Sequence, residues 1–416
     1  MNETSEKKPL LTRAKGAVLH RIRQWAKDLL LFRILPGEYR RAAKQPIQPG
    51  KVVFLENKEP TVPESFEVLY ERLSCVPELD VEFISLGETR VRLRQYYRNC
   101  IEAVRDLATA QCVFLNDASN VVSCLPLREE TTVVQLWHGC GAFKKWGMST
   151  ADLIFGGSRD EILRHPFYKN LSLVTVSSPE VVWAYEEAMV LQDEPGVVQP
   201  IGVSRTDVFF DEAYLKKSRN KLLSVVPEAK GKRAIVYAPT FRGRVAHAEA
   251  PTALDIEAMK RAMGEDAVLL IKHHPFVREL PAIPECCRDF AFDVTHDIAI
   301  NELICSADAV ISDYSSLVFE YSLFGRPMVF FAFDQDEYAD WRGFYYDYDA
   351  LTPGPVCTST EEVIQAIAES AESFDSSEVD KFRDRFMGAC DGHATDRIIE
   401  FALRSEERRV GKECRL

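Results

Sequence analysis

Polar side chains that could handle a phosphorylated substrate follow four apolar, strand-like segments of this chain. The four clusters are Trp137-His138-Gly139 and residues 238–243, 272–275 and 312–316. Only eight histidines occur in the chain, and three of them lie in these clusters: His138, His273 and His274. An imidazole can take up or release a proton near neutral pH. The clusters therefore predict a site that combines proton transfer with anion binding.

The strand-like segment 308–316 ends in Ser315-Ser316 and runs into an apolar stretch of helical spacing. A serine can cap a helix start, and the free N–H groups and positive dipole end there favour a phosphate. Arg242 follows another strand, and its planar guanidinium can hold a phosphate at two points. These residues predict a phosphate site, and a serine cap without a ligand is the alternative.

His138 is followed by a glycine-containing loop and two lysines. Gly139 and Gly141 allow the backbone to approach a ligand closely. Lys144 and Lys145 offer positive charge to a phosphate. We expect a proton-accepting histidine beside a bound substrate, whereas a histidine satisfied within the core is the alternative.

The common nucleotide fingerprints are absent from the sequence. No G-x-x-x-x-G-K-[ST] occurs, and no G-x-G-x-x-G follows a strand. Asp334 and Asp336 resemble an Asp-x-Asp metal pair, but two aspartates in a loop are common on surfaces, and no His/Cys/carboxylate set has structural-zinc spacing. Arg205 and Asp207 lie near the expected domain junction, where a structural ion pair is the alternative to a site role. We expect neither a metal nor a cofactor.

Apolar strands alternate with helices in two successive blocks, which predicts two doubly wound α/β domains with parallel sheets and a cleft between them. In the first block, strands are expected at residues 51–57, 81–87, 111–117, 131–139, 153–158, 171–178 and 197–205. In the second block, they are expected at residues 233–240, 267–275, 308–316 and 326–334. Ligands of such sheets bind outside the carboxyl ends of the strands, where the polar clusters fall.

The charge of the chain is unevenly distributed. The formal net charge is −13, from 51 Lys+Arg and 64 Asp+Glu; residues 1–50 carry 11 and 4 of these, or +7, which leaves −20 for the remainder. The acidic balance argues against nucleic-acid binding. No apolar run approaches the ~20 residues of a membrane-spanning helix. Eleven scattered cysteines without a C-x-x-C pair predict buried, reduced thiols.

The basic head, residues 1–46, contains a predicted amphipathic helix. Its apolar residues recur at spacings of three and four: Leu11, Ala14, Val18, Ile22, Trp25, Leu29 and Phe32. Most of the lysines and arginines lie off that face, and Pro36-Gly37 predicts a break. The pattern predicts that residues 10–44 lie on an anionic membrane surface. A helix packed on the body, or on a partner, is the alternative.

Seven motifs together resemble the CDP-glycerol glycerophosphotransferase family, the teichoic-acid primases and polymerases of bacteria. They are QLWHGCGAFKKWG, GVSRTD, YAPTFRG, LLIKHHP, ISDYSSLVFEYSLFGRPMVFF, FDQDEY and RGFYYDYDALTPGP, in that order, and the resemblance covers about residues 50–400. It implies a GT-B fold with an acceptor domain over residues 47–215 and a CDP-donor domain over residues 216–403. The charged stretch 404–416 is interpreted as a non-native or disordered tail.

The resemblance also implies roles for individual residues. The family's catalytic histidines fall on His138 and His274, although His273 competes with His274 for the motif position. Donor phosphate or nucleotide binding falls on Thr240, Arg242, Asp313, Ser315, Ser316 and Glu320. The residues expected on the acceptor side of the site are Gly139, Lys144, Lys145 and Arg205.

One departure concerns the loop after His138. Family members often have Thr-Pro-Leu there, whereas this chain has Cys140-Gly141-Ala142, which leaves the acceptor's identity open.

The expected reaction is transfer of glycerol phosphate, or a related polyol phosphate, from a CDP-polyol to a hydroxyl group of an acceptor. The resemblance implies an undecaprenyl-diphosphate-linked saccharide as the acceptor and peripheral attachment at the cytoplasmic membrane face. A GT-B glycosyltransferase that uses a nucleotide sugar, and a non-catalytic membrane-attached scaffold, are the alternatives.

Overall fold

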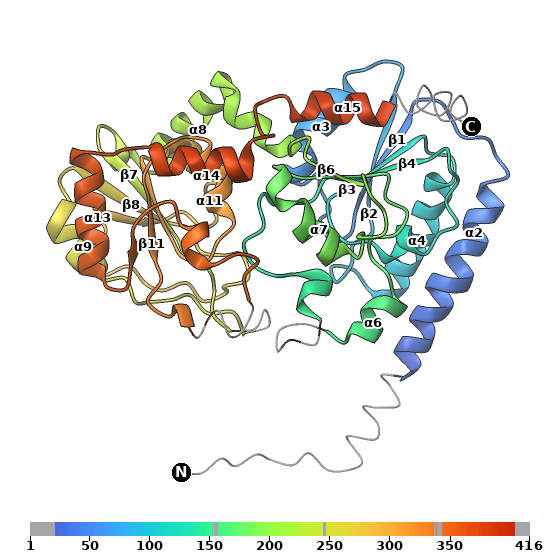
Figure 1. Cartoon of the computed structure of the whole chain (residues 1–416), viewed down its shortest axis with the longest axis horizontal. Helices are drawn as coiled ribbons and strands as arrows, with labels where there is room; N and C mark the ends of the chain where they lie inside the picture. The colour runs from blue at the N-terminus through green and yellow to red at the C-terminus, as the bar shows by residue number, and fades with distance from the viewer. Residues whose placement is uncertain are drawn as a thin grey trace, which may run out of the picture. The chain divides into compact units, whose positions relative to one another are not determined.

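The computed structural model describes residues 21–151, 153, 157–243, 247–336, 338 and 343–403. The chain divides into two compact units. The first comprises residues 1–63, 70–135 and 163–172, and the second comprises residues 64–69, 136–162 and 173–416. Two six-stranded parallel sheets of the predicted doubly wound kind are present (Figure 1). The expected non-native tail, residues 404–416, lies outside the described residues.

The first sheet has the strand order β2-β1-β3-β4-β5-β6. Its strands are β1 (Lys51–Glu56), β2 (Asp80–Ser85), β3 (Cys112–Leu115), β4 (Thr132–Gln135), β5 (Leu173–Thr175) and β6 (Val198–Gln199). The helices along this part of the chain are α3 (Glu64–Ser74), α4 (Leu93–Leu107), α5 (Asn120–Ser123), α6 (Arg159–Arg164) and α7 (Val182–Met189). The strand expected over residues 153–158 is absent from those of its residues that the structure describes.

The second sheet has the order β12-β11-β10-β7-β8-β9, and all five of its strand pairs are parallel. Its strands are β7 (Arg233–Ala238), β8 (Ala267–Ile271), β9 (Ala291–Asp293), β10 (Ala309–Ser312), β11 (Met328–Phe331) and β12 (Val356–Cys357). Read from β9, the strand order is that of the dinucleotide-binding (Rossmann) fold. Successive strands are added outward on one side of β7 and then on the other, so the switch point lies between β7 and β10. The short strands β9 and β12 were not predicted.

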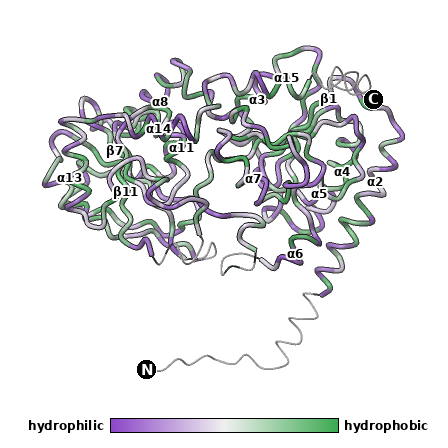
Figure 2. Tube along the Cα trace, in the orientation of Figure 1, coloured by the Kyte–Doolittle hydropathy of each residue, from purple (hydrophilic) through white to green (hydrophobic). Residues whose placement is uncertain are grey.

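Helices cover both faces of the second sheet, and the sequence provides for this with strands that are apolar along their whole length (Figure 2). On one face, α9 (Ile256–Met263) and α13 (Thr360–Glu372) enclose a core that includes Met259, Leu269 and Val363. The remaining helices of this part are α8 (Glu212–Val225), α10 (Ile300–Ser306), α11 (Leu317–Ser322), α14 (Ser377–Met387) and α15 (Ala394–Leu403).

The basic head is helical from residue 21 to Ala42, so the break predicted at Pro36-Gly37 is wrong. A π-helical turn, Leu30–Ile34, comes first, and Pro36 then occupies the first turn of α2 (Leu35–Ala42). A proline is tolerated at that point because the first N–H groups of an α-helical segment need no partner within it.

The apolar stripe of the head is exposed wherever it is described. Ile22 is 55% exposed, Trp25 66%, Leu29 37% and Phe32 42%. A different set packs against the body: Leu30, Leu31, Leu35 and Tyr39 are buried. The described part of the head helix thus packs on the body, as in the alternative considered above, but mainly through residues off the predicted stripe. Phe32 of the stripe also stacks on the His165 ring, with 5.9 Å between centroids, and Leu11, Ala14 and Val18 lie outside the described residues.

Seven of the ten described cysteines are buried, and all ten are free thiols, as predicted. Cys75 and Cys286 are exposed exceptions. Among the described residues, no helix is long and apolar enough to cross a membrane.

Candidate active site

A cavity of about 490 Å³ lies at the carboxyl edge of the second sheet. Thr240 follows β7 and Ser315 follows β10, so the cavity opens where the strand order reverses. The cavity brings together seven of the predicted site residues: His138, Arg205, Thr240, His274, Ser315, Ser316 and Glu320. Their functional roles remain predictions.

A smaller cavity of about 180 Å³ adjoins this group, and His138 and Ser316 line both cavities. Aromatic rings form much of its wall. The Trp137 ring stacks on the His138 ring, and also on the Trp146 ring, with 4.4 Å between centroids in each case. Gly139 and Lys144 line the smaller cavity as well. His138 therefore lies between two spaces that could each receive a substrate.

The loop that carries His138 packs closely on α11. Gly141 has a φ of +62°, and a Cβ atom added to it would lie 2.3 Å from the Phe319 ring. Its N–H also donates to Ser177 Oγ at 3.1 Å. Only glycine suits both this conformation and this approach. The loop's departure from Thr-Pro-Leu thus coincides with close contact to the helix that follows Ser315-Ser316.

Trp137 also has an unusual backbone, with a φ of +60°. A bulky residue rarely adopts this conformation, and such strain often occurs at functional sites.

His274 is half-buried between two rings, 5.0 Å from Phe241 and 4.6 Å from Phe276 between centroids. Its Nδ1 accepts a hydrogen bond from the Phe276 backbone N–H at 3.1 Å. The neutral ring therefore carries its proton on Nε2, which can donate to a substrate oxygen.

His273 lines the same cavity but has a different environment. It is 5% exposed, and its backbone N–H donates to Thr295 Oγ1. Burial lowers the pKa of His273, which favours the neutral ring.

Arg205 connects the His138 loop to α11. Its Nη1 donates to the backbone oxygen of His138 at 2.6 Å, and its Nη2 lies 3.4 Å from Glu320 Oε1. Nη2 also donates to Asn301 Oδ1 at 3.0 Å. Burial raises the pKa of Glu320 although Arg205 opposes this shift. Asp207 instead accepts backbone N–H groups of residues 394 and 395, so the ion pair considered for Arg205 and Asp207 is not present.

Arg242 does not line either cavity. Its Nε and Nη2 donate to Asp334 at 2.5 and 2.9 Å, and its Nη1 lies 3.1 Å from Asp313 Oδ2. Asp313 in turn accepts the N–H and the hydroxyl of Thr240, both at 2.9 Å. Arg242 and Asp313 therefore support the wall that presents Thr240, and direct phosphate binding by Arg242 stays a prediction.

Asp334, considered above as half of a metal pair, has its carboxylate engaged by Arg242 and by the Tyr314 hydroxyl. No group of three or more His, Cys, Asp or Glu side chains placed to hold a metal occurs in the described part of the chain. Lys144 Nζ donates to Tyr338 Oη at 3.2 Å, and Lys145 lines neither of the two cavities.

Two charged residues of the larger cavity were not among the predicted site residues. Lys272 Nζ donates to the backbone oxygens of Thr295 and Ile298 at 2.7 and 2.5 Å, and burial lowers its pKa. Its position directly before the two histidines was an available signal. Glu64 also lines the cavity, and nothing in the sequence connects it with the distant motifs.

The chain matches the family described as CDP-glycerol:poly(glycerophosphate) glycerophosphotransferase over residues 38–404. It is 32% identical to a teichoic acid ribitol-phosphate primase of Bacillus spizizenii over 380 residues, which are 89% of this chain and 96% of the primase. It is 34% identical to a teichoic acid poly(ribitol-phosphate) polymerase of the same species over 358 residues, which are 85% of this chain but only 56% of the polymerase. The fold is similar to that of the wall teichoic acid polymerase TagF, with a TM-score of 0.70 at 22% identity over 94% of this chain and 98% of that one.

Proposed function

Because the chain belongs to the CDP-glycerol:poly(glycerophosphate) glycerophosphotransferase family, we propose that it transfers a polyol-phosphate unit from a CDP-polyol to a hydroxyl group of a lipid-linked acceptor. It is an enzyme of the CDP-polyol phosphotransferase type. The observation that carries the proposal is the position of His138 and Ser316, which line both the larger and the smaller cavity. A donor in one cavity and an acceptor in the other would meet there.

The larger cavity suits the donor diphosphate. Ser315 and Ser316 offer hydroxyl groups, Lys272 and Arg205 supply positive charge, and His274 presents Nε2. These groups are local, so the net charge of the whole chain does not oppose binding of an anion. The smaller cavity, with Trp137 and Trp146 in its wall, would receive the acceptor.

In the proposed reaction, an acceptor hydroxyl oxygen attacks the β-phosphorus of the CDP-polyol. His138 accepts the hydroxyl proton, the bond from the β-phosphorus to the bridging oxygen breaks, and CMP leaves with that oxygen. His274 and the serine hydroxyls stabilise the charge that develops on the leaving group. Catalysis of this kind rests mainly on positioning and charge stabilisation.

The acceptor and the polyol are part of the proposal. Both curated relatives described above are named for ribitol phosphate, which favours CDP-ribitol beside CDP-glycerol as the donor. An undecaprenyl-diphosphate-linked saccharide at the cytoplasmic membrane face is the proposed acceptor.

A donor panel tests the reaction. CMP release is measured with CDP-ribitol, CDP-glycerol and a UDP-sugar on a lipid-linked saccharide, and the product mass shows how many units are added. We expect release from at least one CDP-polyol. Turnover of the UDP-sugar alone would favour the glycosyltransferase alternative, and no release from any donor would favour the scaffold.

The role of His138 is tested by His138→Gln, which should lower the rate about 10²–10⁴-fold. His393→Gln, at an exposed histidine that lines neither cavity, is the matched control and should retain activity. Near-normal turnover by His138→Gln would remove the proposed base.

We also propose that residues 10–44 lie on an anionic membrane surface. The exposed stripe Ile22, Trp25, Leu29 and Phe32 supports this, because such a face is costly to leave in water. Exposed arginines near it, among them Arg21 and Arg33, can meet anionic headgroups.

Vesicle flotation tests the attachment. The full chain should float with phosphatidylglycerol vesicles more than with phosphatidylcholine vesicles, and high salt should weaken binding. The double substitution Ile22→Ser and Trp25→Ser should abolish flotation. The control Leu93→Ser changes a leucine of α4 that is 60% exposed and should have no effect. Equal flotation of all forms would contradict the proposal.

A further inference from the structure

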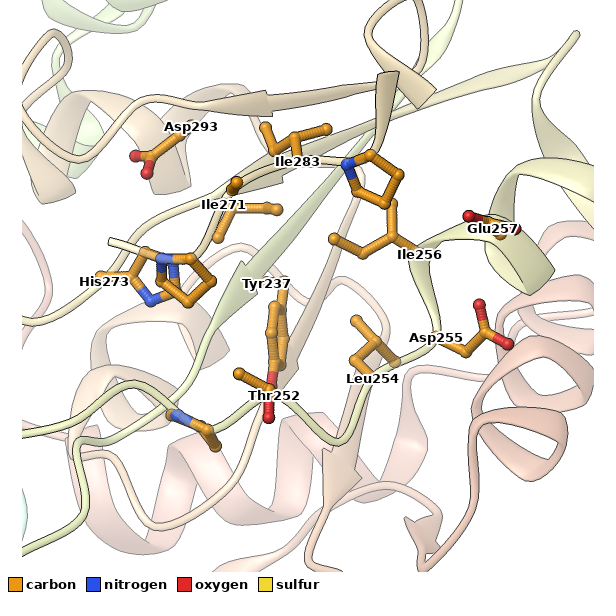
Figure 3. A pocket seen from close by; sticks show the side chains of 14 residues that line it. Tyr237, Thr252, Leu254, Asp255, Ile256, Glu257, Ile271, His273, Ile283 and Asp293 are labelled. Carbon is orange, nitrogen blue, oxygen red and sulfur yellow. The ribbon is translucent and has the colours of Figure 1, made fainter. Parts of the chain in front are cut away.

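A separate cavity of about 380 Å³ opens against the α9 face of the second sheet (Figure 3). Strands β7 and β8 contribute Tyr237 and Ile271, and residues before and within α9 contribute Leu254 and Ile256. Of the residues that the structure describes, His273 alone lines both this cavity and the larger cavity of the candidate active site. The proposed transfer reaction makes no use of this space. Its volume is within the range of pockets that bind small molecules, about 300–1,000 Å³.

Two buried polar atoms of residues that line this cavity have no hydrogen-bond partner in the described part of the chain. They are Tyr237 Oη and His273 Nδ1, and each residue is only 5% exposed. Figure 3 shows the Tyr237 ring between His273 and Leu254, with its hydroxyl end at Thr252 in this view. A buried donor or acceptor that is left unpaired costs about 1–3 kcal/mol, so nearly all such groups in folded proteins have a partner.

The described lining of the cavity disfavours an anion. Among the described residues, no lysine or arginine lines the cavity, whereas Asp255, Glu257 and Asp293 do. Asp255 is engaged as the cap of α9 through the Ala258 N–H, and Asp293 accepts the Thr295 N–H, each at 2.9 Å. Within the described lining, a CDP-polyol or a polyol-phosphate product would meet carboxylates and no cation.

The two unpartnered groups are themselves uncharged near neutral pH. Burial raises the pKa of the Tyr237 hydroxyl and lowers the pKa of the His273 imidazole. A phenol and a neutral imidazole can each donate one hydrogen bond and accept another. The walls beside them are isoleucine, leucine and proline side chains.

We propose that this cavity is a second small-molecule site, which binds an uncharged, compact ring compound that pairs one hydrogen-bonding edge with Tyr237 Oη and His273 Nδ1. The apolar body of the ligand would replace water against Leu254, Ile256 and Ile283. The proposal does not depend on the transfer reaction, because among the described residues this cavity shares only His273 with the larger cavity of the candidate active site.

The test uses benzimidazole as the probe and indene as its apolar counterpart of nearly equal shape, titrated against the full chain by ligand-observed NMR. Benzimidazole should bind more tightly than indene. Tyr237→Phe should weaken benzimidazole about three- to tenfold, the value of one hydrogen bond, and leave indene unchanged. Tyr39→Phe removes another buried tyrosine hydroxyl, far from this cavity along the chain, and should change neither probe.

Several results would overturn the proposal. Equal affinity for the two probes, or equal affinity of wild type and Tyr237→Phe for benzimidazole, would show that the unpartnered atoms bind nothing. Tighter binding of benzylamine, a cation, would contradict an uncharged ligand. Competition between benzimidazole and CMP would place the probe in the donor cavity. If Tyr237→Phe does not fold, Ile256→Trp, which fills the cavity from α9, should abolish benzimidazole binding.

Discussion

Arg205 and Arg242 are both held by carboxylates in the second unit, but their surroundings differ. Arg242 donates from Nε, Nη1 and Nη2 to Asp334, Asp313 and Thr240, and it lines neither cavity of the candidate active site. Arg205 lines the larger cavity, lies 3.4 Å from Glu320, and has an Nε without a hydrogen-bond partner.

The difference shows that a buried arginine can either support the structure around a site or line the site itself. A guanidinium whose donors are all used by protein groups stabilises the structure around it and has little left to offer a substrate. Arg205 instead lines the larger cavity and holds the His138 loop through the backbone oxygen of His138, so a change at Arg205 can reach the site. The following predictions test this distinction.

The largest effect is expected for Arg242→Met, which would strand Asp313 and Asp334 together. Breaking a buried ion pair costs about 3–5 kcal/mol, and we expect a loss of unfolding free energy of that size in a urea titration. Arg326→Met is the control, because Arg326 donates to the backbone oxygens of Cys305 and Ala307 and strands no carboxylate. An equal loss of unfolding free energy in both variants would show that pairing Asp313 and Asp334 is not what makes Arg242 important for stability.

The next effect is expected for Arg205→Lys, measured as kcat/KM for CMP release. Lysine keeps the charge but cannot hold His138 O, Asn301 and Glu320 in one planar arrangement. A small displacement of the His138 loop should lower kcat/KM about 10–100-fold while the urea midpoint changes little. A large loss of stability with unchanged kcat/KM would make Arg205 equivalent to Arg242.

The pH dependence of stability tests the pair of Arg205 and Glu320, which lines the larger cavity. Burial raises the pKa of Glu320 above its usual value of 4.5. In the window between 4.5 and the raised pKa, the folded chain holds a proton that the unfolded chain has lost, so stability falls as pH rises. Relative to Glu320→Gln, the wild type should therefore lose stability from pH 4 to pH 7, as urea midpoints can show. If the wild type instead gained stability relative to Glu320→Gln over this pH range, the pKa of Glu320 would be lowered in the folded chain and not raised.

The smallest effect is expected for Phe333→Leu. The Arg242 guanidinium lies 5.4 Å from the Phe333 ring centroid, and also faces the rings of Tyr314 and Tyr338. Removal of one ring should cost about 0.5–1 kcal/mol in unfolding free energy. Phe374→Leu, at a phenylalanine of similar exposure (40% against 37%), should cost less. Equal losses would show that the ring contributes only its apolar area.

Local pattern was sufficient for most of the fold. Long apolar runs predicted ten strands now seen in the two sheets, and the rule for carboxyl ends correctly grouped His138, Thr240, His274 and Ser315 around one cavity. The pattern failed where an element is too short to show periodicity, as in β9 and β12, and where a π-helical turn lets the head helix pass Pro36.

The sequence by itself determined the order of the elements, the polar clusters at the strand ends and the motifs of the family. Only the tertiary structure decided which buried polar groups are paired and which residues line a cavity. Arg242 follows β7 and pairs with Asp334, a residue 92 positions away. Tyr237 lies within β7, and its hydroxyl has no hydrogen-bond partner among the described residues. Hydrogen-bond saturation of a buried group depends on neighbours brought from distant parts of the chain, and no local pattern records them.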